Sequence, residues 1–89
     1  MQIITLDGNR MTDKRTTHLY LAQTLRFPVY YGRNLDALSD CLTEFLPGSV
    51  IILRNESAML SSLGEYGESL LEVFRNSSSY GIRFFVDPS

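Results

Sequence analysis

The chain has 89 residues, of which 44% are hydrophobic and 20% charged, a composition typical of a globular protein and not of a disordered one. This length gives room for a single domain, residues 1–89, and excludes a multidomain enzyme with a separate cofactor domain. The net charge of −2 argues against direct binding of nucleic-acid phosphates. The acidic charge is concentrated in residues 34–74, which hold seven acids and one base. A cationic partner for this segment, or a solvated acidic face, would explain the asymmetry.

The sequence also limits the compartment in which the protein is expected. Cys41 is the single cysteine, so no internal disulfide can form. The first ten residues lack a basic leader followed by an apolar segment, and the apolar runs at 50–53 and 84–86 are too short to span a bilayer. We therefore expect a soluble, cytoplasmic protein with no membrane partner.

The first third of the chain predicts a strand and a helix. Residues 2–6 are rich in β-branched side chains and end at an Asp-Gly turn signal, which favours a short strand. Asp13, with Thr12, supplies an N-cap for a helix that extends to Arg26 and ends before Pro28. We expect this helix to direct its bases and His18 outward.

A loop at 29–32 precedes the best helix of the sequence, residues 34–46. In the loop, Gly32 is free to take a positive φ. Asn34 is a strong N-cap, and Pro47 with Gly48 closes the helix. One arc of about 100° holds the apolar side chains of this helix, namely Leu35, Leu38, Leu42, Phe45 and Leu46.

The second half predicts two strands and one further long helix. Residues 49–53 contain the continuous run VIIL, typical of a strand covered on both faces. A helical turn is expected within 57–63, an amphipathic helix over 65–77 and a closing strand over 82–86. The order strand, helix, helix, strand, helix, strand indicates an α/β fold with a small parallel sheet and right-handed crossovers.

Three carboxylates occupy one side of helix 34–46. Asp36, Asp40 and Glu44 fall within about 80° of arc, flanked by Ser39 and Thr43. Each step is about 6 Å along the axis, and like charges at this spacing disfavour a helix. Sequences tend to break local rules where function requires it, so the row is a candidate site. The alternative is an ordinary solvated face, the interpretation we prefer for the glutamates at 65, 68 and 72.

Two adjacent tyrosines precede this helix. Because neighbouring side chains of an extended segment point to opposite sides, one of Tyr30 and Tyr31 should be buried and the other free. A free tyrosine beside three carboxylates suits a protein-binding surface, whereas half-buried packing is the simpler alternative.

The sequence argues against an enzyme. His18 and Cys41 are the only residues of their types, and Cys41 lies near the leucine arc, where a buried inert thiol is expected. Zinc would need more nitrogen and sulfur ligands, and carboxylates along one helix do not converge on one Mg²⁺ ion. Gly64 and Gly67 do not form a phosphate-binding loop. We expect no catalytic residues, no metal and no cofactor.

Residues 27–42, FPVYYGRNLDALSDCL, closely resemble the signature of barstar-type ribonuclease inhibitors. Residues 71–75 and the order of elements agree more loosely, so the resemblance spans the chain. It implies a barstar-like fold with a three-stranded parallel sheet and about four helices. Members of the family are intracellular bacterial antidotes, similar in role to antitoxins, that cover the active site of a basic, barnase-like secreted ribonuclease.

The resemblance also implies a role for individual residues in a 1:1 complex with such a ribonuclease. Asp40 would enter the anion pocket in place of substrate phosphate, Asp36 would meet a second cationic site, and Tyr30 would pack on the catalytic rim. The remaining contacts would come from Asn34, Leu35, Ser39, Thr43 and Glu44.

Three positions depart from the family pattern and leave the partner open. Ser39 stands where an aromatic residue can occur, Arg33 reverses a common acidic position and Asn76 replaces a carboxylate. The alternative function is therefore a barstar-like interaction module with a partner that is not a ribonuclease. An enzymatic function would require turnover of a phosphodiester by the isolated protein.

Overall fold

The computed structural model describes residues 2–88, so the outer limits of the predicted domain, residues 1 and 89, lie outside the described residues. Three parallel strands form a sheet in the order β1-β2-β3, namely β1 (Ile3–Asp7), β2 (Val50–Arg54) and β3 (Arg83–Val86). The α-helices are α1 (Lys14–Leu25), α2 (Leu35–Phe45), α3 (Glu56–Leu63) and α4 (Glu65–Asn76). Short 3-10 helices cover Gly8–Arg10 and Ser77–Tyr80. The predicted α/β fold, with its three-stranded parallel sheet, is confirmed.

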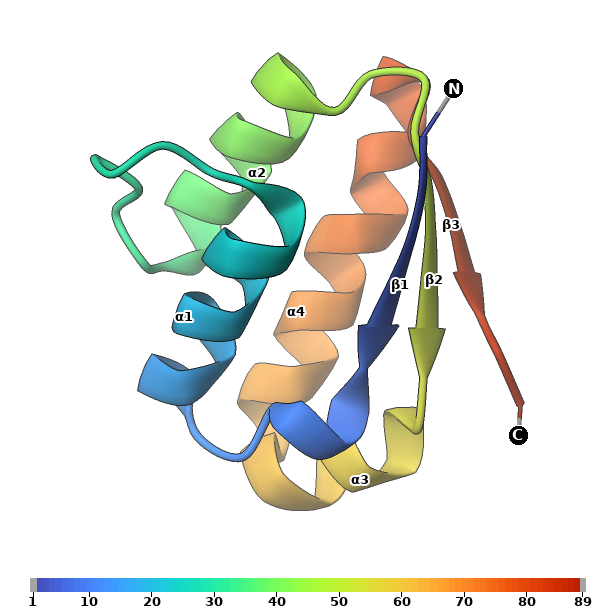
Figure 1. Ribbon diagram of the computed structural model, residues 1–89. Helices are drawn as coiled ribbons and strands as arrows, with labels where there is room; N and C mark the ends of the chain where they lie inside the picture. Colours follow the sequence, from blue (N-terminus) through green and yellow to red (C-terminus); the bar gives the residue numbers. More distant parts are fainter. Residues whose placement is uncertain (1, 89) are drawn as a thin grey trace.

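The helices are arranged on one side of the sheet. Figure 1 shows α1, α2 and α4 against one face, and α3 at the carboxyl ends of the strands. Inward side chains such as Ile51 and Leu53 are buried, whereas Ile3 and Phe85 on the other face are 63% and 53% exposed. The prediction that VIIL is covered on both faces is therefore wrong. Right-handed crossovers between strands that are neighbours in sequence order place the long connecting helices α1, α2 and α4 on the same face.

The core lies between this inner face and the helices. Helix α2 contributes Leu38, Leu42 and the following Leu46, all buried, as its apolar arc predicted. Phe45, expected in the same arc, is 44% exposed at the last turn of α2. Leu19 of α1 is likewise 37% exposed. In the described residues, no helix has the length and apolar content that crossing a membrane requires.

Local hydrogen bonds explain where the long helices begin. The Asp13 carboxylate accepts from the Thr16 backbone N–H at 2.7 Å, and the Asn34 side-chain oxygen accepts from the Ala37 N–H at 2.7 Å. Each bond satisfies one of the donors left free in a first helical turn, which confirms both predicted N-caps. Helix α1 ends at Arg26, which adopts a left-handed conformation with φ 58°.

The segment after β2 is more regular than the sequence predicted. Where a helical turn was expected within 57–63, the structure has α3, and α4 follows it directly after Gly64. Asn55 precedes α3 with a φ of 57°, and its side-chain amide donates to the Asp7 carboxylate at 2.9 Å. This bond joins the ends of β1 and β2.

Gly8 allows the two strand ends to approach each other. A Cβ atom at this position would lie 2.1 Å from the backbone oxygen of Asn55, a distance that no real contact reaches. The backbone cannot move away without disturbing the Asn55–Asp7 hydrogen bond. Only glycine therefore fits at residue 8.

Candidate protein-binding surface

Helix α2 carries the three predicted carboxylates on its solvent side. Asp36, Asp40 and Glu44 are all exposed, while the leucines on the opposite side of the helix are buried. Within residues 2–88 none of the three forms an ion pair. The row is therefore a strip of negative charge with no ion-pair partner in this part of the chain.

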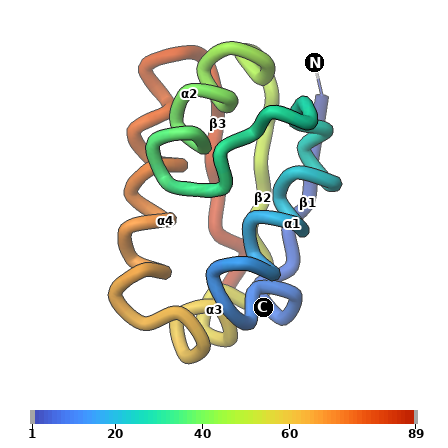
Figure 2. Tube along the Cα trace, turned by 90° about the vertical axis from the view of Figure 1, so that its left-hand side faces the viewer, coloured from blue at the N-terminus to red at the C-terminus, as the bar shows by residue number. Residues whose placement is uncertain are grey.

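The loop before α2 separates its two tyrosines as predicted. Tyr30 is 71% exposed, whereas Tyr31 is buried with 6% of its surface accessible. Figure 2 shows the loop passing between α1 and α2 on the helical side of the molecule. The loop therefore exposes the Tyr30 side chain to solvent and packs the Tyr31 side chain into the core.

A hollow of about 330 Å³ lies between the loop and α2. Its lining includes Tyr30 and Tyr31 from the loop and Asp40, Cys41 and Glu44 from the helix. The structure therefore brings Tyr30, Asp40 and Glu44 to one place. Asp36 and Ser39 are exposed on α2 but do not line this hollow.

Three of the predicted contact residues already serve the chain's own structure. Besides capping α2, the Asn34 side chain donates to the Gly32 carbonyl at 3.3 Å. Leu35 is half-buried against the core, and the Thr43 hydroxyl donates to the Asp40 carbonyl at 3.1 Å. Asn34 and Leu35 thus stabilise the start of α2, in addition to any contact that they make with a partner.

The turn into α2 differs from the sequence expectation. The residue with positive φ is Arg33, at 56°, and not Gly32. The small size of Gly32 still matters, because a Cβ there would lie 3.1 Å from the Ala37 Cβ. Glycine is needed at residue 32 for close approach to α2, not for a left-handed backbone.

Cys41 lies behind the carboxylates. Its thiol is buried, as predicted, and burial raises its pKa, with a further contribution from the negative charges of Glu44 and Asp40. A protonated, shielded thiol is a poor nucleophile.

His18 is buried, so the prediction that it points outward is wrong. Only 2% of the residue is exposed, and its two ring nitrogens contact two tyrosine hydroxyls. Nδ1 lies 2.6 Å from the Tyr31 oxygen and Nε2 lies 2.6 Å from the Tyr66 oxygen. Burial lowers the pKa of His18 and raises the pKa of both tyrosines, which favours the neutral form of all three groups.

A sequence signal for this burial exists. His18 precedes Leu21 by three residues and Leu25 by seven, the spacing of one helix face, and both leucines are buried. The polarity of histidine obscured this pattern.

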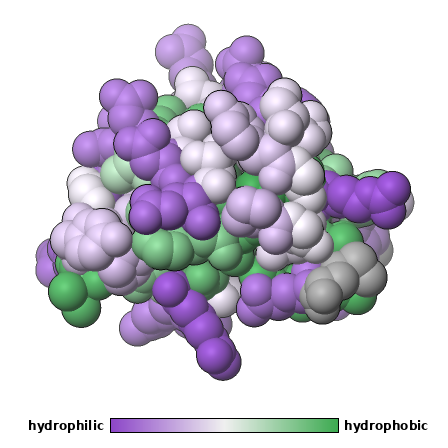
Figure 3. Space-filling view, turned by 90° about the horizontal axis from the view of Figure 1, so that it is seen from above, coloured by the Kyte–Doolittle hydropathy of each residue, from purple (hydrophilic) through white to green (hydrophobic). Residues whose placement is uncertain are grey.

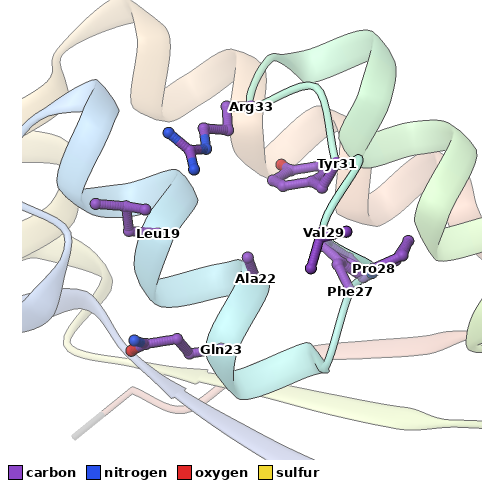
Figure 4. Close-up of a pocket in the computed structure, with 8 residues that line it drawn as sticks. All are labelled: Leu19, Ala22, Gln23, Phe27, Pro28, Val29, Tyr31 and Arg33. Atoms are coloured by element: carbon purple, nitrogen blue, oxygen red, sulfur yellow. The ribbon is translucent and has the colours of Figure 1, made fainter.

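A second hollow lies on the other side of the loop. It measures about 280 Å³ and separates α1 from residues 27–33. Figure 4 shows Leu19, Ala22 and Gln23 of α1 along one side of it and the loop along the other, with the oxygen of Tyr31 directed toward α1. Tyr31 lines both hollows, so the loop is a narrow segment with open space on each side.

The surface of α3 and α4 carries charged side chains that face solvent or pair locally. The glutamates of α4 at 65, 68 and 72 are exposed, and Arg75 pairs with Glu56 at 4.0 Å. Seen from above (Figure 3), apolar residues form separate patches between polar side chains. The described residues include no cluster of three or more histidine, cysteine or acidic side chains suited to a metal ion.

The chain is similar to known proteins over most of its length. The family model described as "Barstar (barnase inhibitor)" matches residues 1–88. A curated protein of Bacillus subtilis (strain 168), named "Putative ribonuclease inhibitor YrdF", is 40% identical over 76 residues, which cover 84% of each chain. A match over nearly the whole length, together with a parallel three-stranded sheet covered on one face and an acidic helix after a Tyr-Tyr-Gly loop, places this chain in the barstar family.

Proposed function

We propose that this protein inhibits a basic, barnase-like secreted ribonuclease by occluding its active site with α2 and the loop before it. The observation that carries the proposal is the row of exposed carboxylates on α2, unpaired within residues 2–88, beside the exposed ring of Tyr30. Family membership and the name of the Bacillus subtilis relative support a ribonuclease as the partner.

The proposed mechanism is substitution of substrate phosphate by protein carboxylates. A ribonuclease must hold cationic groups where negative charge develops on the phosphate. Asp40 lies midway along the exposed row and lines the hollow with Tyr30, so it enters the anion pocket. Asp36, one turn earlier, faces a second cationic site, and Glu44 lies one turn later.

The other contacts surround this centre. Tyr30 packs on the rim of the catalytic site, where its exposed ring supplies apolar area and a hydroxyl. Asn34, Leu35, Ser39 and Thr43 complete the contact around the acidic row. The inhibitor needs no chemistry of its own, since a carboxylate row offers the enzyme no bond to cleave.

Electrostatic attraction makes the proposed complex form quickly. A carboxylate and a cation 4 Å apart at an interface attract each other by about 4 kcal/mol at an effective dielectric constant near 20. Complementary surface charge also steers diffusing partners, for which the barnase–barstar pair is itself the reference case. We place the protein in the bacterial cytoplasm as one domain that forms a 1:1 complex, which protects the cell as an antitoxin does.

An alternative is a barstar-like module with a partner that is not a ribonuclease. It is favoured by the exposed Ser39, which gives α2 no aromatic anchor beside Asp40, and by the exposed Arg33. Asn76 also leaves the end of α4 without an additional carboxylate.

The deciding experiment is a titration of ribonuclease activity. Barnase at fixed concentration is mixed with increasing amounts of the protein, and hydrolysis of a fluorescent RNA is followed. The expected result is a linear loss of activity that reaches zero at equimolar protein. Full activity of barnase, and of a panel of other basic secreted ribonucleases, in excess protein would refute the proposal and favour the alternative module.

A further inference from the structure

The loop that carries Tyr30 has one fully buried side chain, that of Tyr31. The other side chains of residues 26–34 are exposed or half-buried, Phe27 being packed at the edge of the core, and a hollow lies on either side of the loop. Its ring packs against Phe27 with centroids 4.8 Å apart, and its backbone N–H donates to the Pro28 carbonyl at 3.0 Å. Both of these contacts lie within the loop, and apolar packing of the two rings against the core is not directional.

The hydroxyl of Tyr31 adds a directional attachment to the helices. Its hydroxyl contacts Nδ1 of His18 on α1, and Nε2 of the same ring contacts the hydroxyl of Tyr66 on α4. A neutral imidazole donates through one nitrogen and accepts through the other, so either tautomer can satisfy both tyrosines. The Lys14 ammonium lies 4.6 Å from the centre of the Tyr66 ring, a cation–π contact on the far side of this pair of hydrogen bonds.

We propose that His18 is a positioning residue for the binding loop, because it ties Tyr31 to α1 and α4 and so holds Tyr30 in its place beside Asp40. This inference rests on the proposed function, in which Tyr30 and Asp40 meet the same ribonuclease. A loop held in its bound arrangement loses less conformational entropy when the partner arrives, so the contact is tighter.

The first test compares variants for barnase affinity by calorimetry or competition. Tyr31→Phe removes the hydroxyl of the loop, and Tyr66→Phe removes the equivalent hydroxyl on α4. We expect Tyr31→Phe to raise Kd by about two- to ten-fold, the range of one net hydrogen bond, and Tyr66→Phe to raise it less. His18→Leu should raise Kd at least as much as Tyr31→Phe, and His18→Gln, which can still donate and accept, should restore part of the affinity.

The matched control is Ile51→Val, which weakens the core at the centre of the sheet and leaves the loop untouched. A merely structural role of His18 predicts that its variants behave as Ile51→Val does, with lower stability and unchanged Kd. That result would overturn the proposal.

The second test needs no partner. Hydrogen exchange at the Tyr31 amide is measured in the free wild-type protein and in the His18→Leu and Ile51→Val variants. Faster exchange in His18→Leu, beyond that in Ile51→Val, supports positioning, whereas equal protection refutes it. If wild type fails to bind barnase and the panel of ribonucleases, the proposed function fails, and exchange still decides the role of His18.

Discussion

Replacing Asp40 by Asn should make the protein more stable and its complex with a ribonuclease much weaker. Asp40 is exposed, forms no ion pair within residues 2–88 and lies one turn from Asp36 and one turn from Glu44. Its carboxylate therefore contributes repulsion to the free protein and attraction only to a cationic partner.

Both magnitudes follow from this position on α2. Each like-charge pair four residues apart costs a helix about 0.2–0.5 kcal/mol, so loss of two pairs should stabilise the free protein by about 0.4–1 kcal/mol. Asn and Asp have similar helix propensities, so the backbone adds little. Removing one member of a buried interfacial charge pair costs about 2–5 kcal/mol, a range for which the barnase–barstar complex is itself the reference case and which raises Kd from about 30-fold to several thousand-fold.

Urea unfolding of the free protein and inhibition of RNA hydrolysis measure the two effects separately. Glu72→Gln is the control, since it makes the same change of charge on the exposed side of α4. It should leave Kd within about three-fold of wild type, because it lies outside the proposed contact and acts only through long-range charge. An Asp40→Asn protein that is less stable, or that inhibits as well as wild type, would refute the reasoning.

Three further outcomes are expected. Gly8→Ala should lower the free energy of unfolding in urea by about 3 kcal/mol or more, because the new Cβ meets the Asn55 carbonyl. Gly48 has φ 85° and open space around it, so Gly48→Ala should cost only about 1–2 kcal/mol. Equal losses would contradict the close approach at Gly8. Burial lowers the pKa of His18 in the folded protein, so as the pH falls the unfolded chain takes up the proton first. The free energy of unfolding should therefore be greatest above about pH 6.5 and decline below it. His18→Gln should make that decline less steep. A thiol reagent at about pH 8 should modify Cys41 only as the protein unfolds, and reaction of native protein at the rate of a free thiol would show that the thiol is accessible.

The helix that carries the proposed contacts could be predicted because its signals are local. Asn34 caps α2 through the backbone three residues later, and the leucines at 38, 42 and 46 repeat at the spacing of one helix face. The nearness of Tyr30 to Asp40 was also within reach, since a short capped turn joins them. These features depend on neighbours within about ten residues of the chain.

The environment of His18 could not be read in the same way. Its partners, Tyr31 and Tyr66, lie 13 and 48 residues away in the sequence, and nothing local identifies either of them. On a helix of weak apolar periodicity, a polar residue such as His18 is expected at the surface. The ring is nevertheless buried, because hydrogen bonds to two tyrosine hydroxyls satisfy both nitrogens of the neutral imidazole.

The bare face of the sheet was missed for a topological reason. A run such as VIIL is typical of strands buried on both sides, yet Val50 and Ile52 are half-buried here. Which side the helices cover depends on the order of the strands, and strand order is set by pairing between residues as distant as Ile3 and Val50. Composition alone carries no such information.

The central place of β2 in the sheet has a consequence for the order in which the protein is made. Within residues 2–88, both outer strands pair only with β2, and nearly half of the chain separates the first of them, β1, from β2. Every proposed contact residue is synthesised before β2, but α2 packs against α4, which is made later still. When only the first half of the chain has left the ribosome, the acidic residues are already exposed. The sheet and α4, which hold them in place in the folded protein, have not yet formed. The proposed inhibition would begin only with chains that have been synthesised beyond α4.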